Sequence, residues 1–179
     1  MRQGAALALT IAFAVGGCVS VTEKTTLQPQ RLTAVQGAAT PLRCPATLVE
    51  VQDARPAGES AGMFGNRELR FEGAATLIKD QLLASGLTEA KRAGAMDVLV
   101  RLKRLYMSQQ HGINTPVVVL EVTVDRMAPV LIRPRAPSVN WWGSEQELYD
   151  DLGAALTLAN REVIAGLNTR CATSYVPAR

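Results

Sequence analysis

An apolar stripe at helical spacing near the carboxyl end constrains the fold of this sequence most. Residues 144–147, Ser-Glu-Gln-Glu, have the pattern of a capping box, in which the serine and the last glutamate each bind an unpaired amide at a helix start. Behind it, apolar residues recur every three or four positions, at Leu148, Leu152, Ala155, Leu156, Ala159, Val163 and Leu167. The pattern predicts a long helix whose buried face covers an apolar surface supplied by the rest of the chain.

Alternating apolar and polar residues predict strands upstream of this helix. They cover residues 47–53, with Val49 and Val51 on one face, and residues 96–107 and 116–126. Residues 111–115 are expected to form the hairpin loop between the last two strands. Residues 130–132 are expected to form an edge strand. The nearby prolines have no backbone N–H to donate to a neighbouring strand; they are Pro129, Pro134 and Pro137.

A second amphipathic helix is expected between the first two strands. It runs from Asn66, a suitable cap, to Ser85, with Gly86 at the position of a left-handed C-terminal cap. The resulting order is β-α-β-β-(β)-α. This order predicts an α+β fold with a small antiparallel-dominated sheet, both amphipathic helices packed on one face, and the other face polar.

The amino-terminal residues resemble a bacterial lipoprotein signal. Arg2 precedes a short apolar run at residues 5–15, and Val15-Gly16-Gly17-Cys18 has the form of a lipobox. The resemblance implies that residues 1–17 are removed as a signal peptide and that Cys18 carries a diacylglyceryl group and an acyl chain such as palmitate. An ordinary signal peptide with a chance cysteine is the alternative. Because Val19 replaces the aspartate that commonly retains lipoproteins in the inner membrane of enteric bacteria, we expect the periplasmic face of the outer membrane.

Length and composition indicate one domain on a tether. The chain has 179 residues, and removal of 17 leaves 162 (179 − 17). Residues 18–43 lack periodicity and are expected to form a flexible lipidated tether, and residues 44–179 a single periplasmic domain. The 19 Lys and Arg are interspersed with 16 Asp and Glu, so the sequence gives no sign of nucleic-acid binding.

The remaining two cysteines predict a disulfide. With Cys18 lipidated, Cys44 and Cys171 form an even pair in an oxidising compartment, and their bond would join the start of the domain to its end. Two buried free thiols are the alternative. A zinc site is disfavoured, because neither cysteine has a neighbour at ligand spacing.

Several short motifs together resemble the YajG family of bacterial lipoproteins. The lipobox is followed by Asp53-Ala54-Arg55 at a strand end, by the sequence Glu-Leu-Arg-Phe at 68–71, by Leu-Ala-Ser-Gly at 83–86 and by Val-Leu-Val-Arg-Leu at 98–102. The segment 133–135 and the cysteine pair depart from that pattern. The resemblance implies an outer-membrane lipoprotein without an established activity, so it transfers no functional residues.

The sequence contains little that indicates catalytic activity. His111 is the sole histidine and lies in an expected turn, where a solvated side chain is its simplest interpretation. The carboxylates at the helix start complement the helix dipole, at Glu145, Glu147, Asp150 and Asp151. We therefore expect no enzyme, no cofactor and no metal site.

The tryptophan pair is the candidate partner-binding site, together with two arginines. Trp141 and Trp142 precede the helix, and Arg133 and Arg135 lie just upstream. Adjacent rings cannot face the same way, so we expect one, Trp141, to remain exposed for a partner. The alternative is that both rings close the core.

Two functions follow from these expectations. The first is a membrane-anchored lipoprotein that supports cell-envelope assembly or homeostasis by binding an envelope protein. The second is a lipid- or lipopolysaccharide-handling accessory of a transport system. A groove lined by Leu99, Leu105 and Met107 would favour the second, and a flat polar sheet face the first.

Overall fold

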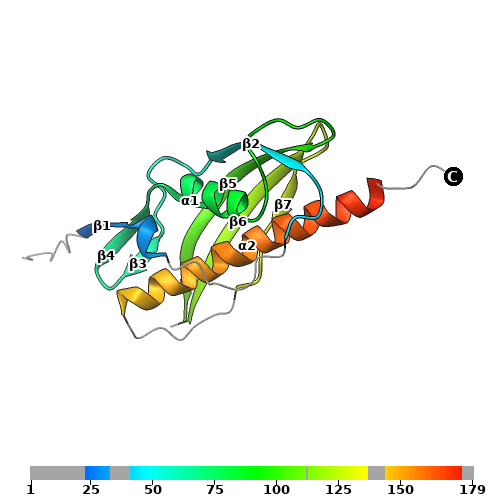
Figure 1. Ribbon diagram of the computed structural model, residues 1–179. Coiled ribbons are helices and arrows are strands. Elements are labelled where there is room, and N and C mark those ends of the chain that lie inside the picture. Colours follow the sequence, from blue (N-terminus) through cyan, green and yellow to red (C-terminus); the bar gives the residue numbers. More distant parts are fainter. Residues whose placement is uncertain (1–22, 33–40, 112, 137–143, 175–179) are drawn as a thin grey trace, which may run out of the picture.

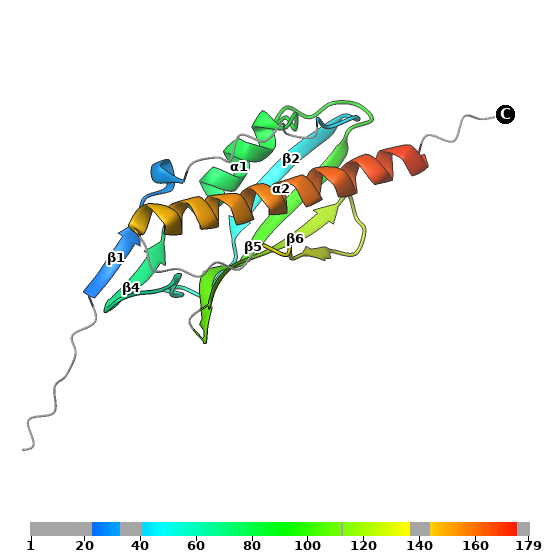
Figure 2. The same cartoon turned by 90° about the horizontal axis from the view of Figure 1, so that it is seen from below.

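The larger sheet confirms the α+β prediction. The computed structural model describes residues 23–32, 41–111, 113–136 and 144–174 (Figure 1). Four strands pair in the order β2-β5-β6-β7, with bounds Ala46–Asp53, Met96–Gln110, Ile113–Val124 and Val130–Ile132. Only β2 and β5 are parallel, so the sheet is antiparallel-dominated. Helices α1 (Ala74–Ala84) and α2 (Glu145–Ser174) both lie on one face of this sheet, as Figure 2 shows.

A second, smaller sheet lies at one end of the molecule. It consists of β1 (Glu23–Leu27), β4 (Arg67–Phe71) and β3 (Gly62–Phe64) in the order β1-β4-β3. Strand β1 is parallel to β4, and β3 is antiparallel to it. The single sheet expected from the sequence is therefore two sheets.

Strand β1 corrects the prediction of a tether over residues 18–43. Leu27 is completely buried and Leu32 is 5% exposed, on either side of the short 3-10 helix Pro29–Arg31. The backbone amide of Gln28 donates to the Tyr149 hydroxyl at 3.0 Å, and Arg31 lies 2.6 Å from Glu145 and over the Tyr149 ring. The fold thus begins no later than β1 and not at residue 44. One buried side chain in five strand residues leaves no periodicity to detect.

Strand β4 corrects the start of the first helix. The helix was expected from Asn66, but it begins at Ala74 after Gly73, whose φ of +72° places it in the left-handed region. Residues 67–71 pair on both sides instead, and the burial of Leu69 and Phe71 follows the period of a strand. The predicted end of α1 is confirmed, since Gly86 has a φ of +110° and the Leu87 amide donates to the Leu82 carbonyl.

The central hairpin is longer than its pattern predicted. Strands β5 and β6 pair from Val98 with Val124 to Gln110 with Ile113, so residues 113–115 belong to β6 and not to a loop. In β2, the pairing register with β5 shifts between Leu48 and Glu50, and Val49 is 59% exposed. Val49 and Val51 therefore do not share a buried face.

Helix α2 confirms the strongest sequence pattern. The Ser144 amide donates to the Glu147 carboxylate at 3.0 Å, and the Glu147 amide donates to the Ser144 hydroxyl at 3.4 Å. Every residue of the predicted stripe is at most 2% exposed. The predicted Cys44–Cys171 disulfide is present, and Asn168 of α2 also binds the backbone of Arg43 and Pro41. The start of β2 is thus fixed to the end of α2.

Candidate functional site

Strand β7 presents an exposed apolar edge. In the described part of the chain, β7 is the last strand of its sheet and no strand pairs with its outer edge. Val130 is 46% exposed, Leu131 66% and Met127 46%, which are three of the five exposed large apolar side chains among the described residues. Val130 and Leu131 are successive strand residues and project to opposite faces of the sheet, whereas the unpaired backbone groups of the free strand edge are where another chain can add.

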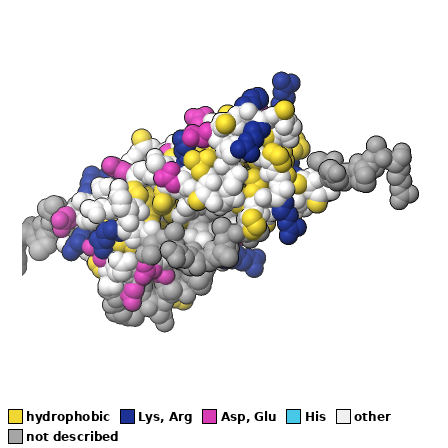
Figure 3. Space-filling model, in the orientation of Figure 1, with side chains coloured by type: hydrophobic (Ala, Val, Ile, Leu, Met, Phe, Trp, Pro, Cys, Tyr) yellow, Lys and Arg dark blue, Asp and Glu magenta, His cyan; other side chains and the backbone are white. Residues whose placement is uncertain are grey.

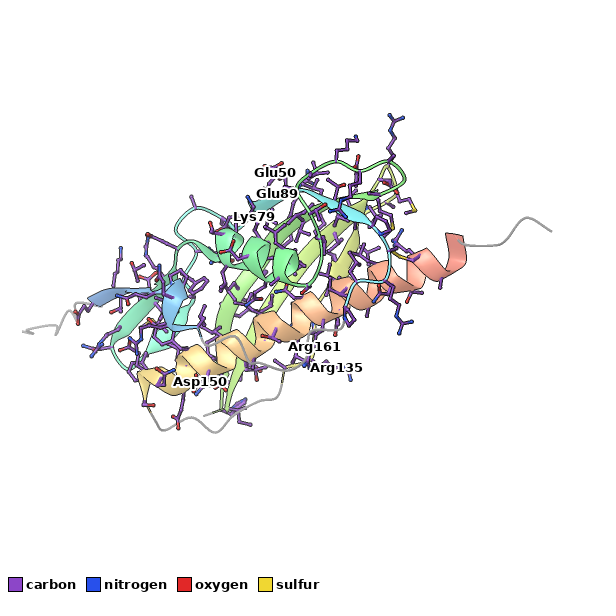
Figure 4. The ribbon with its side chains drawn as sticks, viewed as in Figure 1. Glu50, Lys79, Glu89, Arg135, Asp150 and Arg161 are labelled. Atoms are coloured by element: carbon purple, nitrogen blue, oxygen red, sulfur yellow. A yellow bond between two sulfur atoms is a disulfide. The ribbon has the colours of Figure 1, made fainter. Side chains whose placement is uncertain are left out.

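The predicted residues Arg133 and Arg135 extend this edge. Both are exposed, and Pro134 between them is buried. Figure 4 shows Arg135 below α2. They line a shallow hollow of about 470 Å³, whose walls are Thr115, Pro116, Val117, Arg133, Pro134, Arg135 and Ala136. We call residues 126–136 the β7 edge from here on.

The charge of the β7 edge is positive. It contains the exposed arginines Arg126, Arg133 and Arg135 and no acidic residue. Figure 3 shows that acidic and basic side chains are otherwise interspersed on the visible face. The β7 edge therefore combines exposed apolar surface with a single sign of charge.

The predicted Trp141 and Trp142 lie outside the described residues. The structure places Arg133 and Arg135 on the β7 edge but does not test their association with the tryptophans. Sequence reasoning did not single out Val130 and Leu131 as exposed apolar groups. The three prolines around them were a signal for an edge strand, but not for which side chains face solvent.

The sheet face away from the helices is polar where β2, β5 and β6 lie side by side at Gln52, Arg101 and Glu121. On this face Arg101 of β5 donates to Gln52 of β2 and to Glu121 of β6, both at 3.0 Å. Gln52 in turn donates to Glu50 of the same strand at 2.8 Å. Leu105 and Met107 instead point into the core and are at most 3% exposed. They therefore line no groove with Leu99, which is half-buried and pairs with Thr123 of β6.

A small apolar hollow lies between the sheet edge and α2. Its volume is about 80 Å³, and it is lined by Val122, Val124, Val130, Ile132, Val163, Gly166, Leu167 and Arg170. Pockets that enclose a small ligand usually measure roughly 300–1,000 Å³. This hollow is too small to hold a lipid acyl chain without rearrangement.

Asp53 and Arg55 order the loop after β2, as their position predicted. The Arg55 guanidinium donates two hydrogen bonds to the Asp53 carboxylate, at 2.6 and 2.8 Å, and one to the Phe71 carbonyl at 2.6 Å. These hydrogen bonds lower the pKa of Asp53, although partial burial acts in the opposite direction. The pair joins the end of β2 to the end of β4 and lines a polar hollow of about 450 Å³.

The carboxylates at the start of α2 have structural partners. Glu147 completes the capping box, and Asp150 accepts a hydrogen bond from Gln146 at 3.0 Å (Asp150 is labelled in Figure 4). Burial raises the pKa of Asp151, with smaller contributions from Glu147 and Asp150. His111 is exposed at the β5–β6 turn.

The described residues contain no group of three or more His, Cys, Asp or Glu side chains that could hold a metal ion. Over the same residues, no helix has the length and apolar character needed to cross a membrane.

Comparison with solved structures gives a likeness of fold. A crystal structure of protein XCC0632 from Xanthomonas campestris, described under the family-model DUF330, aligns with a TM-score of 0.50 at 9% identity. The alignment covers 84% of this chain and 98% of the other. A second structure, described as an uncharacterized protein, aligns at 10% identity with a TM-score of 0.37 over 73% of this chain and 95% of its own. No family model and no curated protein matches the sequence.

The fold therefore defines a class: an α+β domain of the architecture seen in a DUF330 protein. At 9% identity the shared feature is the fold, and neither activity nor partner follows from it.

Proposed function

We propose that this chain is an outer-membrane lipoprotein of the YajG type, anchored through Cys18 at the periplasmic face. In this proposal it has no catalytic activity and supports cell-envelope assembly or homeostasis by binding another envelope protein. The lipobox and the cysteine pair support the location. The observation that carries the binding role is the exposed, positively charged β7 edge.

The geometry of the β7 edge favours an extended partner segment. A free strand edge offers unpaired backbone groups, and an added strand takes its affinity from main-chain hydrogen bonds. Val130 and Leu131 would contact apolar side chains of the added strand, and Arg126 and Arg133 would contact flanking carboxylates. The partner is therefore expected to present an extended apolar segment with acidic flanks.

The alternative, a lipid- or lipopolysaccharide-handling accessory of a transport system, has less support. The face that would need an apolar groove carries the Arg101–Glu121 pair, and the apolar hollow beside α2 is about 80 Å³. Protein binding is therefore the function that the geometry supports best.

The anchor is tested by Cys18→Ala. Metabolic labelling with a fatty-acid analogue should mark the native protein and not the variant, and fractionation should place the native protein in the outer membrane. Label retained on the variant would contradict lipidation of Cys18. Native protein in the inner membrane would contradict the sorting prediction.

The binding role is tested by a photoreactive residue placed in cells at Leu131 and, as a matched control, at Val49. Both side chains are apolar and exposed on edge strands of the same sheet. We expect a discrete protein adduct from position 131 alone, and its loss when Leu131→Asp is combined with a probe at position 130. Adducts only to lipid, or equal protein adducts from both positions, would contradict the proposal.

A further inference from the structure

We propose that the end of the molecule formed by β1 and the β3–β4 turn lies directly against the surface of the membrane that holds the anchor. This inference rests on the proposed lipidation of Cys18 and adds an orientation to it. It names an interaction surface whose partner is a phospholipid headgroup layer.

The first step is the length of the connection. Only residues 19–22 separate Cys18 from Glu23, the first residue of β1. Five Cα-to-Cα steps span at most about 18 Å when fully extended. A connection reaching to residue 43 would have allowed the domain tens of ångströms of freedom.

The second step is that β1 cannot easily leave the domain. Leu27 is fully buried, and β1 pairs with β4 along all five of its residues. Just beyond it, Gln28 and Arg31 bind α2 through Tyr149 and Glu145. The short connection therefore restrains the whole domain, and not a loose terminal segment.

The third step identifies what else lies at this end. Glu23 pairs with Arg67, which also pairs with Phe64 across the β3–β4 turn. The Gln109 amide near the tip of the β5–β6 hairpin donates to the Met63 carbonyl at 2.8 Å. The start of β1 therefore lies next to the β3–β4 turn, and the hairpin tip lies beside β3.

The chemistry of this end suits shallow contact with headgroups. Phe64 is half-buried and Ile113 at the hairpin tip is 45% exposed, and Lys24 is an exposed cation. Glu23 is also exposed, so the charges nearly balance. The surface alone would bind lipid weakly, and the short connection supplies the high local concentration that makes the contact persistent.

The consequence is an orientation for the domain. Helix α2 has 30 residues and is about 45 Å long, and it runs from the β1–β4 end to the opposite end of the molecule (Figure 2). With the β1–β4 end on the membrane, the loop between α1 and β5 points into the periplasm.

The test uses full-length lipidated protein in vesicles of phosphatidylethanolamine and phosphatidylglycerol. Because Cys18 is acylated and Cys44 is bonded to Cys171, an introduced cysteine is the sole free thiol. Asn66→Cys in the β3–β4 turn and Arg92→Cys in the α1–β5 loop are both at exposed positions. Each is labelled with a fluorophore, and a nitroxide is attached to the lipid headgroup as a quencher.

We expect strong quenching at position 66 and none at position 92. Insertion of about 20 Gly and Ser residues between Val21 and Thr22 should relieve the quenching at 66, since such a linker reaches roughly 25 Å on average. Equal quenching at both positions, or quenching that survives the insertion, would overturn the inference. Mass measurement of the acylated terminus separates this outcome from failure of the proposed anchor, which would show as an unacylated Cys18.

Discussion

Leu27→Ala tests whether β1 is part of the domain or of a tether. The Leu27 side chain is fully buried in the hydrophobic core, and Leu27 pairs with Phe71 of β4. Truncation of a fully buried leucine to alanine costs about 2–5 kcal/mol, combining the lost transfer free energy with the cavity left behind. The upper part of this range applies if β1 stays in place around the cavity.

The loss of unfolding free energy in Leu27→Ala is limited by the free energy needed to detach β1 from the rest of the domain. Strand β1 is at the edge of its sheet, and the following contacts of Gln28 and Arg31 with α2 oppose its release. If the truncation exceeds that free energy, residues 23–32 will open locally while the larger sheet stays folded. The variant then shows a smaller loss of global stability and a new protease-sensitive site.

The measurement is urea unfolding of the disulfide-intact mature protein, followed by circular dichroism, together with limited proteolysis. Thr26→Ala is the matched control, since Thr26 is the exposed neighbour on the same strand and should change stability by less than about 0.5 kcal/mol. A Leu27→Ala variant with both the native unfolding free energy and the native protease resistance would refute the inclusion of β1 in the core.

Three further predictions concern other contacts. Replacing both disulfide cysteines with serine should lower the unfolding free energy by up to about 5 kcal/mol, because the bond closes a separation of 127 residues; native-like stability of the variant would contradict this. Gly62→Ala should destabilise the protein by about 1–3 kcal/mol, since its φ is +114° and a Cβ would lie 2.9 Å from the Met107 carbonyl oxygen; Gly65→Ala, which meets no such contact, is the comparison. Asp53→Asn should lower the unfolding free energy at neutral pH, and the difference from the native protein should shrink as pH falls below about 4. The pKa of Asp53 is lowered in the folded state, so its contribution to stability is present above the unfolded pKa and is lost when the carboxylate is protonated. A pH-independent difference would refute the role of the Arg55 hydrogen bonds.

The candidate site was only partly predictable from the sequence. Arg133 and Arg135 were singled out, and the structure places both on an exposed edge beside an apolar strand. The exposure of Val130 and Leu131 could not be predicted, since a short apolar run reads the same whether it is buried or not. How β7 packs beside β6 and α2 decides the exposure of these side chains, and only the tertiary structure shows that packing.

The sequence by itself determined the elements whose signals are local. Helix α2 has its capping box and its apolar stripe within one segment, and the end of α1 is set by Gly86 and Leu87. The alternation in β5 and β6 is likewise complete within each strand. Such patterns can be recognised without knowing which segments pack together, because caps and helical faces join residues that are close in the chain.

The tertiary structure alone decided which segments pair across long separations. Phe71 lies at helical spacing from Ala74 and Ile78, yet β1 on one side and β3 on the other hold residues 67–71 as the central strand of a second sheet. Residues 23–27 carry no pattern at all and are fixed only by that pairing and by the burial of Leu27. Strand formation depends on partners distant in sequence, whose hydrogen bonds and packing outweigh weak local propensity.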